Sequence, residues 1–192
     1  MRSVQKRVTG ALVVAAALAL AAYGYSQVSA AKAWGSGKNH EARQPRPIQL
    51  GVSGGNATDS ARGYCCSGTL GALVTNGTAQ YILSNAHVFA HDIFPPDIAE
   101  EGDPIDQPGL VDVKCGDRPK DYVANLSAWA PVDGTANVDA AIAEVVPGAV
   151  DPDGRILEIG TIAATPVAAS LNQKVKKSGR TTGLTSSYVT AI

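Results

Sequence analysis

"GTLGALVTNGTAQYILSNAHV" (residues 68–88) predicts two neighbouring β-strands joined by a tight turn. A short apolar run extends from Thr69 to Val74, and the Asn-Gly pair at 76–77 is a strong signal for a hairpin turn. Residues 78–84 then form the second strand. His87 follows the end of that strand, where a side chain is easily presented to a cleft. The stretch therefore predicts a hairpin followed by a candidate functional histidine.

Other short segments of strand character follow at similar spacing, separated by turns rich in the chain's 20 Gly and 11 Pro. Residues 122–129 alternate between apolar and polar side chains, as a strand does. Residues 137–146 are the next candidate strand, although their alanines would also suit a helix. The segments 174–180 and 186–192 are expected to form two short strands, whereas residues 90–111 are expected to form a loop. This pattern predicts an all-β barrel or sandwich.

The N-terminus has the three parts of a secretory signal peptide. Basic residues at positions 2, 6 and 7 precede an apolar run at 11–22, and small residues follow at 28–30. An uncleaved anchor is the alternative, but a membrane span needs about 20 apolar residues. We therefore expect a signal peptide over residues 1–30, a flexible linker over residues 31–47, and export to the cell envelope, the periplasm or the medium. No stable membrane span is expected after cleavage.

The composition limits the classes of partner. With 45% hydrophobic and 17% charged residues, the chain can form a core and is not disordered in character. Residues 92–158 contain fifteen acidic and four basic residues, and no basic patch interleaved with aromatic residues occurs in the chain. The sequence therefore gives no support to nucleic-acid binding.

Three cysteines are expected to be structural. Cys65 and Cys66 are adjacent, and Cys115 lies fifty positions after Cys65. Export to an oxidising compartment favours a bridge between one member of the pair and Cys115, with one thiol left over. No C-x-x-C spacing is present, so a structural zinc site is not predicted.

His87 and His91 lie four residues apart, a spacing that on a helix would place both rings on one face, as in a metal site. The helical zinc motif needs Glu directly after its first His, and Val88 occupies that position. The segment before His87 also has strand character. No metal and no cofactor are therefore predicted.

A histidine acts as a general base when a carboxylate orients its ring and stabilises the imidazolium. Asp139 is a candidate partner, because it lies between Val138 and the apolar run 140–143. Within a strand it would be buried and would need a partner. Alternatively, Asp139 begins the strand and caps a turn after Asn137. Both interpretations are open from the local sequence.

Four segments resemble the chymotrypsin/trypsin-like serine peptidases, in particular a bacterial branch whose histidine motif is S-N-x-H-V. They are "YILSNAHV" (81–88), "GDPIDQPG" (102–109), "NVDAAIAEV" (137–145) and "KSGRTTGLT" (177–185). The resemblance extends from Ile48 to the C-terminus.

This resemblance implies an all-β, two-barrel fold and hydrolysis of peptide bonds by a Ser-His-Asp triad. The first β-barrel would span residues 48–146, and residues 147–192 would form the opening strands of the second. His87 would be the general base and Asp139 its orienting partner. His91 would be a loop residue beyond the motif, and His40 would lie in the linker.

The nucleophile of such a triad is not found in the sequence. The family's order is His, Asp, Ser, but only 53 residues follow Asp139 and no G-D-S-G occurs. Ser178 lies in a segment that matches the strand leading towards the nucleophile, and Ser186 and Ser187 lie in the next strand. We therefore expect a chain truncated before its nucleophile and inactive alone, which would act on a polypeptide substrate if the missing part were supplied. The alternative is a non-catalytic, exported binding module derived from a protease.

Overall fold

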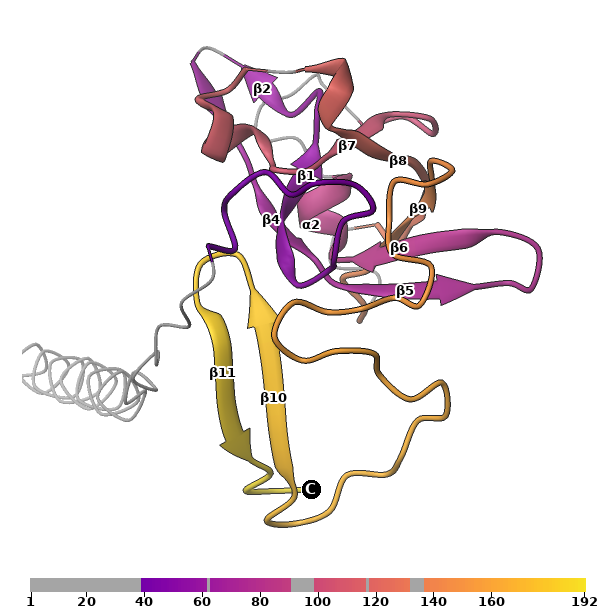
Figure 1. Cartoon of the computed structure of the whole chain (residues 1–192), viewed down its shortest axis with the longest axis vertical. Helices are drawn as coiled ribbons and strands as arrows, with labels where there is room; N and C mark the ends of the chain where they lie inside the picture. Colours follow the sequence, from indigo (N-terminus) through magenta and orange to yellow (C-terminus); the bar gives the residue numbers. More distant parts are fainter. Residues whose placement is uncertain (1–38, 62, 91–98, 117, 132–136) are drawn as a thin grey trace, which may run out of the picture. The chain divides into compact units, whose positions relative to one another are not determined.

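The hairpin expected from residues 68–88 is present in a computed structural model of the protein (Figure 1). Strand β5 (Ala72–Thr75) pairs antiparallel with β6 (Gln80–Ser84). In the turn between them, the Asn76 side-chain oxygen accepts hydrogen bonds from the backbone N–H groups of Thr78 and Ala79, both at 2.9 Å. The side chain of Asn76 thus orders the turn, as asparagine commonly does. The hairpin prediction is confirmed.

The structure describes residues 39–61, 63–90, 99–116, 118–131 and 137–192. The signal-peptide prediction for residues 1–30 and the placement of His91 lie outside these ranges. No helix in the described ranges has the length and apolar character that crossing a bilayer requires.

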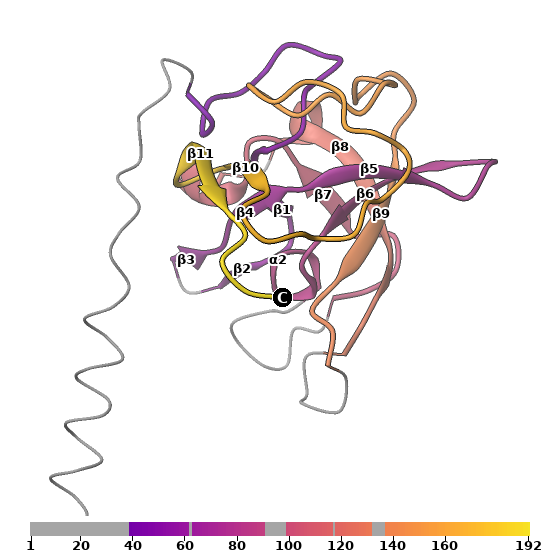
Figure 2. The same ribbon diagram turned by 90° about the horizontal axis from the view of Figure 1, so that it is seen from below.

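Seven strands form one antiparallel sheet that is nearly closed into a barrel (Figures 1 and 2). Its order is β4 (Gly68–Leu70), β1 (Val52–Asn56), β7 (Pro104–Asp106), β8 (Tyr122–Trp129), β9 (Ala141–Val145), β6 and β5. The first and last strands of this order, β4 and β5, are separated in the chain by Gly71 alone, so they are two halves of one bent strand. The prediction of an all-β, barrel-like fold is confirmed, and β8 has the bounds expected from the sequence.

Strand β7 was not expected, because residues 90–111 were assigned to a loop. It has three residues and begins at Pro104, which cannot donate a backbone hydrogen bond. Its partners are distant in sequence: Asn56 of β1 lies opposite Ile105, and Asn125 of β8 lies opposite Pro104. Three residues are too few for an alternation of apolar and polar side chains to reveal this strand.

Gly71 permits the bend that closes the sheet. Its backbone N–H donates to the carbonyl oxygen of Leu83 at 3.1 Å. A Cβ atom on residue 71 would lie 2.6 Å from that same oxygen, which is closer than real Cβ contacts allow. Only glycine therefore lets the bent strand approach β6 this closely.

The barrel interior is apolar and includes the short helix α2 (Ala86–Phe89), which follows β6. Phe89 is fully buried, and its carbonyl oxygen accepts a hydrogen bond from the buried side chain of Asn56 at 2.9 Å. The other core members, all buried, are Ile48, Leu50, Val52, Leu70, Ile82, Ala86, Ala99, Ile105, Val123, Ala124, Leu126, Ala141, Ala143, Ala149, Val150 and Leu157. The packing of Phe89 and its bond to β1 hold α2 in place.

The described part of the expected linker, residues 39–47, makes polar contacts with residues distant in the chain. His40 is 4% exposed, and its Nε2 atom lies 2.8 Å from Glu158 Oε2. The Arg43 guanidinium contacts both carboxylate oxygens of the buried Asp121. The segment has no periodic pattern because polar contacts with residues distant in the chain hold it.

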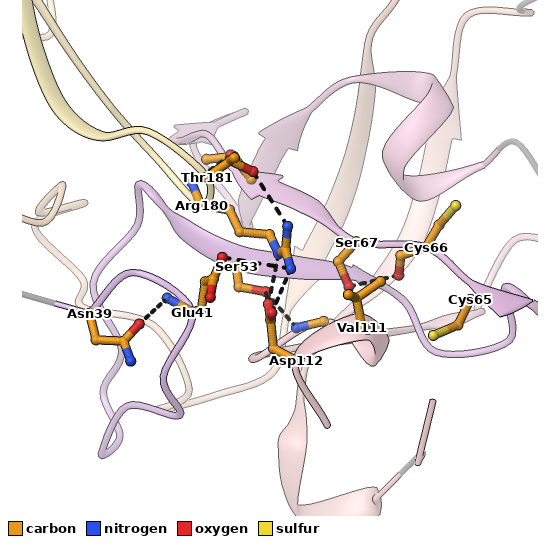
Figure 3. A network of polar contacts seen from close by, with 12 residues as sticks. Asn39, Glu41, Ser53, Cys65, Cys66, Ser67, Val111, Asp112, Arg180 and Thr181 are labelled. Carbon is orange, nitrogen blue, oxygen red and sulfur yellow. Dashed lines mark hydrogen bonds and ion pairs between the residues drawn. The ribbon is translucent and has the colours of Figure 1, made fainter. Parts of the chain in front are cut away.

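Strands β10 (Lys174–Gly179) and β11 (Gly183–Tyr188) form a separate two-stranded ribbon. This confirms the expected pair of strands, although the second begins three residues earlier than predicted. Arg180, in the turn, binds Asp112 through two hydrogen bonds, from Nε to Oδ2 at 2.7 Å and from Nη2 to Oδ1 at 2.5 Å (Figure 3). Asp112 belongs to the 3-10 helix η1 (Leu110–Val113), so this ion pair fastens the ribbon to η1.

Cys65 and Cys115 form a disulfide, with Cα atoms 5.6 Å apart. It joins β3 (Tyr64–Cys65), which pairs with β2 (Ser60–Ala61), to the chain just beyond η1. The prediction of a bridge from one of the adjacent cysteines to Cys115 is confirmed, and Cys66 is the free thiol. Burial, with the neighbouring Asp59 carboxylate, raises the pKa of Cys66 to about 11, which keeps it largely in the unreactive thiol form.

A second 3-10 helix, η2 (Pro119–Asp121), leads into β8.

We expect Gly71→Ala to lower the free energy of unfolding by about 1–3 kcal/mol, because its methyl group would collide with the Leu83 carbonyl oxygen. Urea denaturation monitored by tryptophan fluorescence measures this change. Gly55→Ala is the control, since Gly55 is buried within β1 and its added Cβ would meet no atom closer than 3.5 Å. Equal stability of the two variants would contradict the role given to Gly71.

Candidate active site

The sheet register brings His87 and Asp139 together. Ser84, the last residue of β6, lies opposite Ala141, the first residue of β9. His87 follows β6 by three positions, and Asp139 precedes β9 by two. Since the strands are antiparallel, both residues emerge from the same end of the sheet. Their meeting depends on the pairing of β6 with β9, although 52 positions separate them.

The two side chains form a short hydrogen bond. His87 Nδ1 lies 2.5 Å from Asp139 Oδ2, and the backbone N–H of His87 donates to Asp139 Oδ1 at 3.1 Å. The Asn85 side-chain amide donates to the backbone oxygen of Asp139 at 3.1 Å and to Oδ2 at 3.2 Å. Sequence reasoning did not single out Asn85. Its sequence signal is its place in the S-N-x-H-V motif, two residues before the candidate base.

Neither member of the pair is buried among the described residues. The side chain of His87 is 55% exposed and that of Asp139 is 39% exposed. Of the two interpretations open from the local sequence, the one that buries Asp139 within a strand is wrong, because β9 begins only at Ala141. The other interpretation places Asp139 before the strand, which is where it lies. There its carboxylate binds His87 and Asn85.

The hydrogen bonds favour the ionised form of Asp139. Burial, the largest single effect, would raise its pKa, but the backbone and side chain of His87, the charge of that ring and the backbone of Ala86 together hold the pKa of Asp139 below its ordinary value of 3.8. A carboxylate can only accept, so the bond assigns a proton to Nδ1 of His87. In the neutral ring, Nε2 then carries the lone pair that a general base needs. No hydrogen-bond partner of Nε2 is found within the described ranges.

Ser178 lies near a different histidine. Its Oγ atom is 3.3 Å from His40 Nδ1 and donates to the carbonyl oxygen of Gly51 at 3.1 Å. With Glu158 these residues resemble a Ser-His-Glu set, but both ring nitrogens of His40 face acceptors, the Gly51 carbonyl at 2.8 Å and the Glu158 carboxylate. The ring is also buried, so His40 is placed to hold structure and not to accept a proton from Ser178.

The other serines weighed as nucleophiles, Ser186 and Ser187, lie on β11 in the ribbon. In the part of the chain that the structure describes, no serine is hydrogen-bonded to His87, and no group of three His, Cys, Asp or Glu residues could hold a metal ion. The alternative of a metal site formed by His87 and His91 includes His91, which lies outside the described residues. The structure thus brings together the expected base and carboxylate, without a nucleophile among the described residues.

A groove of about 630 Å³ lies at the other end of β6 and β9. Glu144, which lines it, is opposite Tyr81 at the start of β6 and is therefore distant in register from Ser84 and His87. Its other lining residues include Pro47, Gln80, Pro147 and Pro152. This groove is separate from the His87–Asp139 pair.

Comparison of the chain with protein-family models and with curated proteins finds no match. The interpretation of the pair therefore depends on its geometry and on the sequence motifs.

We expect His87→Ala to raise the pKa of Asp139 towards 3.8, because the variant removes one hydrogen bond and the favourable charge of the ring. Carbon-13 NMR of the aspartate carboxyl groups measures it, with Asn125→Ala, an exposed position on β8, as the control. Since the folded-state pKa is lowered, the pair stabilises the fold above pH 3.8, and this stabilisation is lost as the pH falls through the lowered pKa. An unchanged titration of Asp139 in His87→Ala would show that the two side chains are not bonded in solution.

Proposed function

We propose that this chain is the part of an exported, chymotrypsin-like serine endopeptidase that carries the general base. The observation that carries the proposal is the 2.5 Å contact between His87 Nδ1 and Asp139 Oδ2. The bond uses Nδ1, and the His87 side chain is 55% exposed at one end of a nearly closed β-barrel. The order of the two motifs in the sequence and their resemblance to those of the family support the same assignment.

In this proposal His87 and Asp139 have the roles of base and orienting carboxylate. Nε2 of His87 takes the proton from a serine hydroxyl as the oxygen attacks the carbonyl carbon of a peptide bond, and then gives that proton to the leaving amine. Asp139 holds the ring in the Nδ1-protonated tautomer and stabilises the imidazolium. We propose that the serine and the amides that stabilise the oxyanion come from outside this chain, and we therefore expect the chain alone to be inactive towards peptides.

We further propose that the seven-stranded sheet, within residues 48–146, is the first of two barrels, and that β10 and β11 begin the second. Two observations support this division. The ribbon is not hydrogen-bonded to the seven-stranded sheet as one of its strands. It is instead attached through side chains, chiefly by the ion pair of Arg180 with Asp112.

The rival function is a non-catalytic binding module, which would use a surface such as the groove lined by Pro47, Gln80 and Glu144. It differs from the first proposal in what it requires of His87. A binding module needs no base at this position, whereas a peptidase needs an unprotonated, accessible Nε2 that can accept a proton.

We expect the purified chain to hydrolyse p-nitrophenyl acetate slowly through His87. Nε2 attacks the ester carbonyl, p-nitrophenolate leaves, and water hydrolyses the acyl-imidazole. His87→Ala should lower the second-order rate constant at pH 7.5 by about threefold or more, because it removes an exposed, oriented imidazole. Lys174→Ala, which removes an exposed amine, should leave it unchanged. A rate constant that is the same with and without His87 excludes its role as a base.

We expect a fluorophosphonate probe, which reacts with activated serines, to leave the purified chain unlabelled. Labelling that disappears in His87→Ala would show that the chain already contains the nucleophile. Translation of the genomic sequence beyond the codon of Ile192 in three frames separates the two functions. A G-D-S-G segment supports the peptidase, and non-coding sequence supports the binding module.

A further inference from the structure

Asn85 is the N-cap residue of α2, yet its side chain does not cap that helix. An N-cap asparagine normally accepts a hydrogen bond from a backbone N–H in the first turn of its own helix. Here the side-chain amide is turned away and donates twice to Asp139, to its backbone oxygen and to Oδ2. An ordinary capping role therefore does not explain Asn85.

Asp139 supplies the missing cap from another part of the chain. Its Oδ1 atom accepts the backbone N–H of His87, which is the second residue of α2. The Asp139 carboxylate therefore caps α2 in place of Asn85, and the Asn85 side-chain amide binds that carboxylate. The helix start and the conformation of Asp139 depend on the same contacts.

These contacts hold both oxygens of the carboxylate. Oδ1 receives the His87 backbone N–H, while Oδ2 receives both His87 Nδ1 and Asn85 Nδ2. Because Asn85 also binds the backbone oxygen of Asp139, it restrains the main chain and the side chain of the same residue. A carboxylate that is 39% exposed would otherwise be free to rotate towards water.

We propose that Asn85 is a positioning residue for the His87–Asp139 pair, and this inference rests on the proposed function of that pair. Asn85 does not touch the reacting Nε2 atom; it acts by fixing the carboxylate that orients the ring. The hydrogen bonds to the Asp139 side chain come from one short segment of the chain, residues 85–87. The pair is therefore assembled by the barrel, and no described residue of the ribbon contributes a hydrogen bond to it.

The requirement at position 85 is an amide donor of this length. Aspartate has the same shape but would place a second carboxylate against Asp139, where like charges repel. Serine is a favoured N-cap and would preserve α2, but its shorter side chain does not reach across to Asp139. These properties distinguish positioning from helix capping.

The test uses the full chain labelled with nitrogen-15 histidine, with the Nδ1 proton of His87 identified by its loss in His87→Ala. A proton in so short a hydrogen bond resonates far downfield of the amide signals. In Asn85→Ala and Asn85→Ser we expect this signal to shift upfield or to broaden beyond detection. The His87-dependent rate constant for p-nitrophenyl acetate should fall about three- to tenfold, as expected for losing one hydrogen bond to a charged group at a partly exposed site.

Two controls define the comparison. Asn125→Ala removes an exposed amide elsewhere on the barrel, and Arg180→Ala detaches the ribbon from Asp112. Both should retain the Nδ1 signal and the rate constant of the unmodified chain. Asn85→Ser tests the role even if Asn85→Ala unfolds, because serine preserves the cap.

If folded Asn85→Ser retains the Nδ1 signal and the rate constant of the unmodified chain, the positioning role of Asn85 is overturned. A rate constant that still depends on His87 would then continue to support His87 as the base. If the rate does not depend on His87, the proposed function fails. A shift of the Nδ1 signal in Asn85→Ser would then still support Asn85 as the residue that holds the pair. Loss of the signal in Arg180→Ala would contradict assembly by the barrel alone.

Discussion

The close approach of Gly71 to Leu83 is the constraint on which the barrel and its candidate site depend. At this point one strand changes partners, pairing with β1 before the glycine and with β6 after it. The sheet can therefore curl back on itself, and β6 lies between β5 and β9. The same register places the end of β6 beside the start of β9, which is where His87 meets Asp139. A side chain at residue 71 would separate the strands that create this meeting.

Asp112 has a comparable role at the junction with the ribbon (Figure 3). Its carboxylate accepts a hydrogen bond from Ser53 of β1 at 2.5 Å and two from Arg180, and Glu41 lies 3.8 Å from the same guanidinium. Arg180 is mostly buried, and Asp112 holds the pKa of its guanidinium above the ordinary value despite the opposing effect of burial. The contacts of Asp112 and Arg180 thus join η1, β1, residue Glu41 and the ribbon. The His87–Asp139 pair does not take part in this network.

Local patterns predicted the elements that local interactions specify. The hairpin at 72–84 has its own turn chemistry, β8 alternates along its full length, and Gly179 and Gly183 flank the turn of the ribbon. The elements that were missed depend on distant partners. Strand β7 is too short to show alternation, and the contacts of His40 with Glu158 and of Arg43 with Asp121 join residues far apart in the chain. The apolar neighbours of Asp139 left open whether it lies within a strand or before one, and the strand begins two residues later.

The sequence by itself determined an all-β chain, the hairpin that leads to His87, a cystine involving Cys115, and two candidate site residues in a meaningful order. These follow from periodicity, turn residues and motif spacing, all of which act over a few positions. Only the tertiary structure decided that Cys65 rather than Cys66 forms the bridge, that Ser178 lies against His40 rather than His87, and that Asn85 binds Asp139. Each of these depends on which strands are neighbours, and strand neighbours are fixed by the packing of the whole sheet rather than by any one segment.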